Sequence, residues 1–190
     1  VFSGHARLKD AARSFSYAPW LVANLTLSRP PEERSGAPLA WDNVLHRGSG
    51  LGYVVATHQQ MRVWRGGTVL TWYRSFDELA PEVARTALRE TPREGWAEQI
   101  IAELEKPHAD IRHVTSRLDV FRNAHAMVRP LPGLIWSDAR ARFAADGERL
   151  RFAHADVSGF SLFEEAQYRG ILAAERTLRR LRVRFSSSLA

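Results

Sequence analysis

The sequence predicts a mixed α+β protein built on an antiparallel β-meander with flanking helices. Three observations lead to this fold class. Residues 17–28 form an apolar run of strand length, residues 41–74 contain short alternating runs separated by glycines, and the segment after residue 78 has apolar residues at helical spacing. With 190 residues and 21.5 kDa, the chain is long enough for one ordinary domain or slightly more.

The strands are predicted from short apolar runs between turn residues. A loop rich in proline and charge covers residues 29–40, three glycines at 48, 50 and 52 precede the next strand, and Gly66-Gly67 is a hairpin turn signal. The expected strands are residues 17–28, 53–58, 61–64, 68–74, a β-rich run at 110–128, and a short final strand at 149–155.

The helices are predicted from apolar spacing and from their start signals. Ser75 and Asp77 are candidate caps, Thr91-Pro92 places an N-cap before a proline at the first helical position, and Ser161-Leu162-Phe163-Glu164 has the form of a capping box. The expected helices are residues 4–15, 78–90, 92–105, 138–146 and 161–182.

Composition excludes several classes of site. The chain has no cysteine, which rules out disulfides, thiolate metal sites and cysteine nucleophiles. No apolar run reaches about 18 residues, so no membrane span is expected. The seven histidines have no metal-ligand spacing, and neither a G-x-S-x-G nor a Walker sequence is present. The first residue is Val1, which favours a processed product, an excised domain or a fragment.

The charge balance is strongly basic but has two explanations. The formal net charge is +6, and 25 of the 27 basic residues are arginine. This balance indicates either an anionic partner or the codon bias of a GC-rich genome. Five arginines between residues 176 and 184 fit a solvated helix end, where cations complement the helix dipole. Nucleic-acid contact is the alternative for this cluster and is not expected.

The most informative stretch runs from residue 150 to 181. A short strand ends at Asp156, a glycine-containing turn follows, and the next helix carries small residues at 166, 170, 173 or 174, and 177. Such a stripe permits either close packing on a sheet or the approach of a flat ligand. The free N–H groups of the helix start favour an electron-rich ligand group, and Asp156 could accept hydrogen bonds from ligand hydroxyls.

Residues 151–175, RFAHADVSGFSLFEEAQYRGILAAE, resemble the C-terminal flavin-contacting segment of the FAD-dependent amine oxidase and phytoene-desaturase-like superfamily. Residues 18–27, 125–130 and 132–133 are similar to the same group more weakly. The resemblance implies that Asp156 meets the ribityl–phosphate part of FAD and that Leu162 and Phe163 lie near the pyrimidine edge of the flavin. The cofactor-contacting set that it implies is Ala155, Asp156, Ser161, Leu162, Phe163 and Glu164.

The resemblance also implies a division of the chain. Residues 1–145 would form a substrate-binding-type α+β region, and residues 146–190 would supply the last strand and long helix of an incomplete FAD-binding domain. The N-terminal G-x-G-x-x-G unit that holds the pyrophosphate is absent, because in residues 48–52 the third glycine falls one position early and a strand follows. The expected partner is therefore the remaining N-terminal FAD-binding portion of a longer parent protein.

The expected activity is hydride transfer from an organic small-molecule substrate to the flavin of that parent. Leu162 stands where amine oxidases carry a cage tyrosine, which argues against a classical amine substrate. Trp72 and Trp136 are the candidate substrate-pocket residues, although Trp64, Trp72 and Tyr73 also fit a core. His154 fits a backbone hydrogen bond or a catalytic base. The alternative function is a stand-alone α+β module that binds a hydrophobic ligand or a protein partner without a cofactor.

Overall fold

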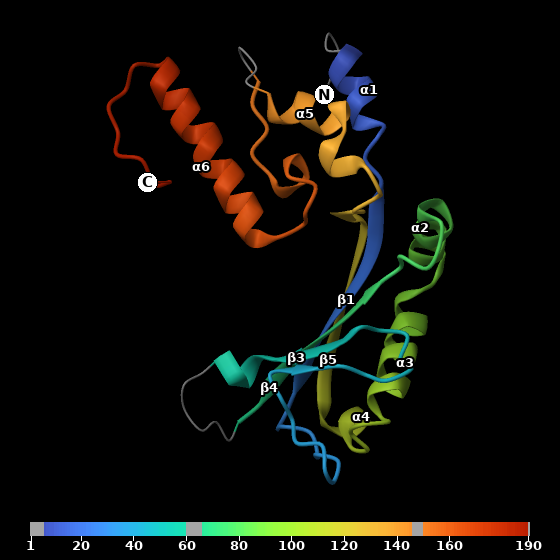
Figure 1. Cartoon of the computed structure of the whole chain (residues 1–190). Helices are drawn as coiled ribbons and strands as arrows, with labels where there is room; N and C mark the ends of the chain where they lie inside the picture. Colours follow the sequence, from blue (N-terminus) through green and yellow to red (C-terminus); the bar gives the residue numbers. More distant parts are fainter. Residues whose placement is uncertain (1–5, 60–65, 146–149, 190) are drawn as a thin grey trace. The chain divides into compact units, whose positions relative to one another are not determined.

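The computed structural model describes residues 6–59, 66–145 and 150–189 (Figure 1). The chain forms two compact units. One consists of residues 18–126, and the other combines residues 1–17 with residues 127–190. This split lies elsewhere than the division after residue 145 that the resemblance implied, because helix α5 (Asp138–Ala144) packs with helix α1 (Ala6–Ala12).

The unit of residues 18–126 is built on a five-stranded sheet with the order β2-β3-β4-β1-β5. The pairs β1–β4, β3–β4 and β2–β3 are antiparallel, as a meander requires. The strands are β1 (Tyr17–Leu27), β2 (Asp42–Asn43), β3 (Gly52–Val55), β4 (Thr68–Ser75) and β5 (Thr115–Val128). The predicted α+β class with an antiparallel sheet is thus confirmed.

One face of the sheet carries the core of this unit. Along β1, the side chains from Leu21 to Leu27 alternate between buried and half-buried, and the register pairs Ala23 with Trp72 and Leu25 with Leu70. Three helices cover this face: α2 (Pro81–Glu90), α3 (Arg93–Leu104) and α4 (Ile111–Val114) (Figure 1). Their buried side chains include Ala84, Leu88, Trp96, Ile100, Leu104 and Ile111.

The opposite face of the sheet is only half-buried. Trp20 stacks on Tyr73 with ring centroids 6.3 Å apart, and the Thr71 hydroxyl donates to Asn24 Oδ1 at 2.8 Å. The Tyr73 hydroxyl also donates to Asp42 Oδ1 at 3.0 Å. Since this face combines aromatic rings with satisfied polar groups, it differs in chemistry from the apolar core face.

The second unit packs around a small aromatic cluster. Besides α1 and α5 it contains the 3-10 turns η2 (Leu134–Trp136) and η3 (Ala155–Val157) and the helix α6 (Phe163–Arg180). Phe143 contacts Phe15 and Phe152 edge to face, with centroid distances of 5.4 Å and 4.7 Å. The Ser137 hydroxyl caps α5 by accepting from the Arg140 backbone N–H.

Two predictions in the segment before α6 are wrong. Residues 150–154 have no regular secondary structure, because a strand needs a hydrogen-bonding neighbour and none of the described strands pairs with them. The capping box at residues 161–164 does not form either. The helix begins at Phe163 with Leu162 as N-cap, and the Ser161 hydroxyl accepts a hydrogen bond from the Val128 N–H at 3.0 Å instead.

Other boundaries differ by smaller amounts. Strand β3 ends at Val55 and continues as a 3-10 turn, η1 (Ala56–Gln59), while residues 111–114 form α4 before β5 begins. Pro92 is the N-cap of α3 rather than its first residue, because Thr91 is the C-cap of α2. The predicted strand at 61–64 lies outside the described residues.

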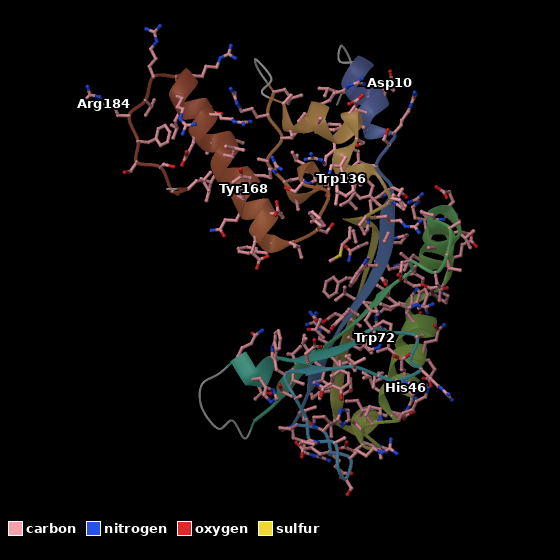
Figure 2. All side chains as sticks on the ribbon, viewed as in Figure 1. Asp10, His46, Trp72, Trp136, Tyr168 and Arg184 are labelled. Atoms are coloured by element: carbon pink, nitrogen blue, oxygen red, sulfur yellow. The ribbon has the colours of Figure 1, made fainter. Side chains whose placement is uncertain are left out.

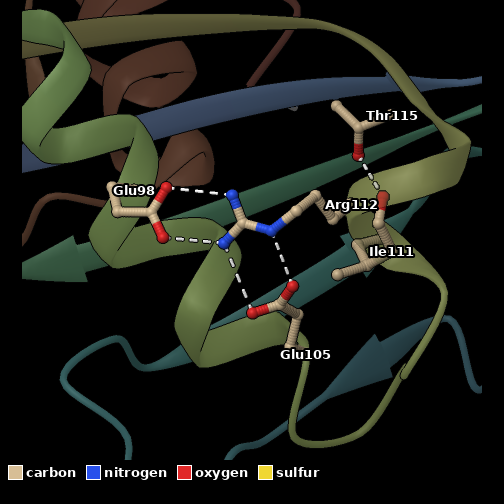
Figure 3. A network of polar contacts seen from close by, with 5 residues as sticks. All are labelled: Glu98, Glu105, Ile111, Arg112 and Thr115. Atoms are coloured by element: carbon tan, nitrogen blue, oxygen red, sulfur yellow. Dashed lines mark hydrogen bonds and ion pairs between the residues drawn. The ribbon is translucent and has the colours of Figure 1, made fainter.

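An arginine on α4 ties that helix to α3. Arg112 donates to both oxygens of Glu98, at 2.9 and 2.7 Å, and its Nε donates to Glu105 at 2.7 Å (Figure 3). Hydrogen bonds from Arg112 lower the pKa of both carboxyl groups. The network therefore fixes the turn between the two helices at neutral pH.

Candidate functional site

Asp156 is held in place by two neighbours in the structure. The Tyr17 hydroxyl donates to Asp156 Oδ2 at 2.5 Å, across 139 residues of sequence. The Asp156 backbone N–H donates to His154 Nδ1 at 3.3 Å. Because Nδ1 accepts this bond, the imidazole carries its proton on Nε2 in the neutral state. His154 thus acts as a local cap of η3, which agrees with the backbone-bonding alternative.

In the Tyr17–Asp156 hydrogen bond, tyrosine remains the donor and the carboxylate the acceptor across the physiological pH range. Burial, the hydrogen bond to Asp156 and the charge of that carboxylate together raise the pKa of Tyr17 well above its usual value. Tyr17 therefore stays protonated and continues to donate to the carboxylate. The Asp156 side chain keeps 17% of its surface exposed, so it remains accessible to a further hydrogen-bond donor.

A small pocket lies beside this pair. Its volume is about 140 Å³, and its walls combine the rings of Phe15, Phe143 and Phe152 with the polar groups of Tyr17 and Asp156. Aromatic walls with one carboxylate suit a ligand portion that is apolar on one side and carries a hydroxyl on the other.

The start of α6 is open to solvent and has no side-chain cap. The first α-helical hydrogen bond joins the Ala166 N–H to the Leu162 carbonyl at 3.1 Å. The N–H groups of residues 163–165 therefore precede the helical ladder, which is the usual arrangement at a helix N-terminus. Phe163 is 76% exposed and Leu162 is 55% exposed.

The turn between η3 and α6 is fixed by its own interactions. Gly159 adopts φ +81°, which favours glycine, and the Gly159 N–H donates to the Asp156 carbonyl at 3.0 Å. Arg169 Nε donates to the Ser158 hydroxyl at 2.7 Å, and Arg140 donates to the Val157 carbonyl at 3.1 Å. These bonds set the direction in which α6 leaves Asp156.

At Gly170, the central glycine of the small-residue stripe on α6, no other part of the described chain packs closely against the helix. A Cβ at Gly170 would meet no heavy atom of the described residues within 4 Å. Room for a side chain is therefore present, although glycine costs about 1 kcal/mol relative to alanine inside a helix.

The residues predicted to contact the cofactor lie in one continuous stretch of this unit. Leu162, Phe163 and Glu164 are exposed at the helix start, while Ala155 and Asp156 belong to η3 and are half-buried. The Ser161 hydroxyl accepts a hydrogen bond from the Val128 N–H, so this interaction occupies the side chain that was predicted to contact the cofactor.

The two predicted pocket tryptophans lie in different surroundings (Figure 2). Trp136, at the end of η2, is 84% exposed. Trp72 is buried in the sheet core, where its indole N–H donates to Glu103 at 3.0 Å, and this agrees with the core alternative.

Glu103 is a buried acid that the sequence analysis did not identify as a candidate site residue. It lies buried on α3 and accepts four hydrogen bonds, from Ser49 N–H, Ser49 Oγ, Gly50 N–H and the Trp72 indole. The glycine-rich segment 48–52 therefore surrounds an internal carboxylate rather than a dinucleotide phosphate. A Cβ at Gly50 would lie 2.5 Å from the Trp72 ring, so glycine is required at this close approach. The contact joins residues far apart in the sequence, and no local pattern indicates it.

The sequence analysis also did not identify the hydrogen-bonded pair of Tyr53 and His108. The Tyr53 hydroxyl lies 2.6 Å from His108 Nε2, and His108 Nδ1 lies 2.7 Å from the Glu32 carbonyl. The carbonyl can only accept, so Nδ1 donates to it and Nε2 accepts from Tyr53. Burial raises the pKa of Tyr53 to about 12.

Neither a metal centre nor a membrane helix is found in the described part of the chain. No group of three or more His, Asp or Glu side chains is arranged to hold a metal ion there. None of its helices combines the length and apolar character needed to cross a membrane. In the comparisons with known proteins, no family model matches this chain and no curated protein matches it.

Proposed function

We propose that this chain is the C-terminal part of an FAD-dependent, amine oxidase-like oxidoreductase, in which an organic substrate passes a hydride to the flavin. The observation that supports this most is the open, uncapped start of α6 directly after the anchored Asp156. The resemblance of residues 151–175 assigns the same two features to the flavin.

The residues present fit such a cofactor. Asp156 has an accessible carboxylate that would accept from a ribityl hydroxyl, and Tyr17 would hold that carboxylate in position. The N–H of Phe163, ahead of the first helical bond, would donate to the pyrimidine edge of the ring. Bound FAD would supply the hydride acceptor, and the protein would contribute orientation and the exclusion of water.

The surface features also fit an uncharged organic substrate. In the unit that carries the proposed flavin contacts, Trp136 offers an exposed aromatic ring and Leu162 an exposed apolar side chain. Aromatic and apolar groups favour ring-containing or alkyl substrates over ionic ones.

The test uses the product of the complete reading frame that contains these residues. We expect it to purify with flavin absorbance, or to acquire that absorbance when FAD is added. Asp156→Asn should weaken FAD binding about tenfold, because one charge-assisted hydrogen bond is lost. Asp138→Asn, which changes an exposed acid at the start of α5, is the matched control and should leave FAD affinity unchanged.

Two results would overturn the proposal. The first is a folded product that has no flavin and binds none when FAD is added, and this result would favour the stand-alone binding module. The second is equal FAD affinity in the Asp156→Asn variant and the parent protein. The isolated 190-residue chain is expected to bind FAD weakly, since it lacks the G-x-G-x-x-G pyrophosphate unit.

A further inference from the structure

A second pocket lies within the unit of residues 18–126. Its volume is about 400 Å³, which is in the size range of small-molecule sites. The loop of residues 34–48 forms one side, and the end of α3 with residues 106–108 forms the other. All of these residues belong to one compact unit.

The wall of this pocket is held by hydrogen bonds. The Glu32 N–H donates to Asp110 at 2.9 Å, and the Leu39 N–H donates to Glu33 at 3.1 Å. Asn43 binds the Ala40 N–H and carbonyl through its side-chain amide, at 3.0 and 2.8 Å. The Glu32–Asp110 bond ties the start of the loop to the rest of the unit, and the pairing of Asp42 and Asn43 with strand β3 ties its other part to the sheet. The pocket therefore exists before any ligand arrives.

The floor of the pocket is polar but internally satisfied. Buried Glu103 and His108 line it together with Tyr53. Glu103 accepts four hydrogen bonds, and His108 and Tyr53 bond to each other. The floor therefore has little capacity left for a ligand that carries many donors, and the side walls are apolar at Pro38, Leu39 and Val44.

The mouth of the pocket is positive. Arg34, His46 and Lys106 line it and are exposed, and none of the three forms an ion pair within the described residues. Glu103 is the one acid among the lining residues, and it is buried. Arg34 and Lys106 thus face solvent outside any described ion pair, while the Glu33 carboxylate of the same loop is held by the Leu39 N–H. The two exposed cations favour an anion at the entrance.

From these features we infer that this pocket binds a small amphiphilic anion, with its apolar part against the Leu39–Val44 wall and its acid group at Arg34 and Lys106. The chemical class is an organic monocarboxylate with a short alkyl or ring portion. This site lies outside the residues assigned to the flavin and does not depend on that assignment.

The experiment titrates the purified chain with sodium octanoate and with octan-1-ol, its uncharged analogue, by isothermal calorimetry and by NMR. We expect octanoate to bind with shifts at Leu39 and Val44 and to bind more weakly at high salt. The double variant Arg34→Gln/Lys106→Gln should lose affinity about fivefold or more. The matched control, Lys9→Gln/Arg89→Gln, removes the same charge elsewhere and should bind as the parent does.

Three outcomes would overturn the inference. They are the absence of octanoate binding by the folded chain, equal affinity for octanoate and octanol, and an equal loss of affinity in the two double variants. Circular dichroism and the amide NMR spectrum establish folding, and Val44→Asp serves as a second probe. This exposed substitution places a negative charge on the wall and should abolish octanoate binding while the chain stays folded.

Discussion

Glu103 shows how hydrogen bonds alone can stabilise a buried carboxylate that has no cationic partner among the residues described. Burial alone raises the pKa of its carboxyl, but hydrogen bonds from Ser49, Trp72 and Gly50 outweigh burial and lower the pKa overall. The carboxylate thereby joins three parts of the chain: helix α3, strand β4 and the glycine-rich loop.

Glu103→Gln should lower the free energy of unfolding by about 1–3 kcal/mol, because the amide cannot accept at both positions and a buried donor loses its partner. Urea unfolding of the variant and the parent at neutral pH measures this loss. Gln99→Glu, on the exposed side of the same helix, is the control and should change stability little. A stable Glu103→Gln variant would show that the loop is held by other contacts.

The same residue predicts part of the pH dependence. Since the folded pKa of Glu103 lies below its unfolded value, its contribution is complete above the unfolded pKa and is lost as pH falls through the folded pKa. The stability difference between parent and Glu103→Gln should therefore shrink in acid. Unfolding curves at a series of pH values from neutral to acid would reveal this trend, and a constant difference would contradict it.

At the scale of elements, one glycine inside α6 and one in the turn before it have opposite expectations. Gly170→Ala should stabilise the isolated chain by about 0.5–1 kcal/mol, because the added methyl group meets open space and the helix propensity improves. Gly159→Ala should destabilise it by about 1 kcal/mol, because φ +81° strains an L-residue. Thermal unfolding of both variants tests the pair. A destabilising Gly170→Ala would mean that another backbone packs against the stripe.

The arginine network between α3 and α4 predicts a salt-dependent effect. Arg112→Ala should lower the melting temperature at low ionic strength and have a smaller effect in concentrated salt, because all three groups are exposed and screened. Arg117→Ala, which breaks a single ion pair with Asp119, is the comparison and should have a smaller effect. Equal effects at low and high salt would exclude an electrostatic origin.

Local patterns were sufficient to predict most elements. Apolar spacing within a few residues predicts strands β1 and β4 and helices α2 and α3. The strand expected at 149–155 failed because pairing depends on a distant neighbour, and the capping box failed because Ser161 found a partner 33 residues away in Val128. Long-range hydrogen bonds of this kind leave no trace in local spacing.

At the scale of the whole molecule, the sheet unit has its own core and its own helices. Residues 18–126 expressed alone should therefore fold and unfold cooperatively. Circular dichroism and a thermal melt measure this, with Trp72→Ala as the control that removes a central side chain and should abolish or strongly weaken the transition. A disordered fragment would show that the unit needs the rest of the chain.

The candidate site was only partly predictable from the sequence. Asp156 and the start of α6 became candidates because a turn and a helix signal follow the aspartate within a few residues, and their role as a site stays a prediction. Tyr17 was missed because it lies 139 residues from Asp156, and the pocket near Lys106 was missed because its walls come from separate loops. The proximity of such residues is a property of the tertiary fold.

The placement of Lys106 at the mouth of its pocket has a practical consequence. The chain has 25 arginines but only two lysines, Lys9 and Lys106, so an amine-acylating reagent meets few side chains. A molecule seated between Lys106 and Val44 would shield that amine while leaving Lys9 reactive. The ratio of the acylation rates of Lys106 and Lys9, measured by peptide mass spectrometry, would therefore report how much of the pocket is occupied, without an engineered label.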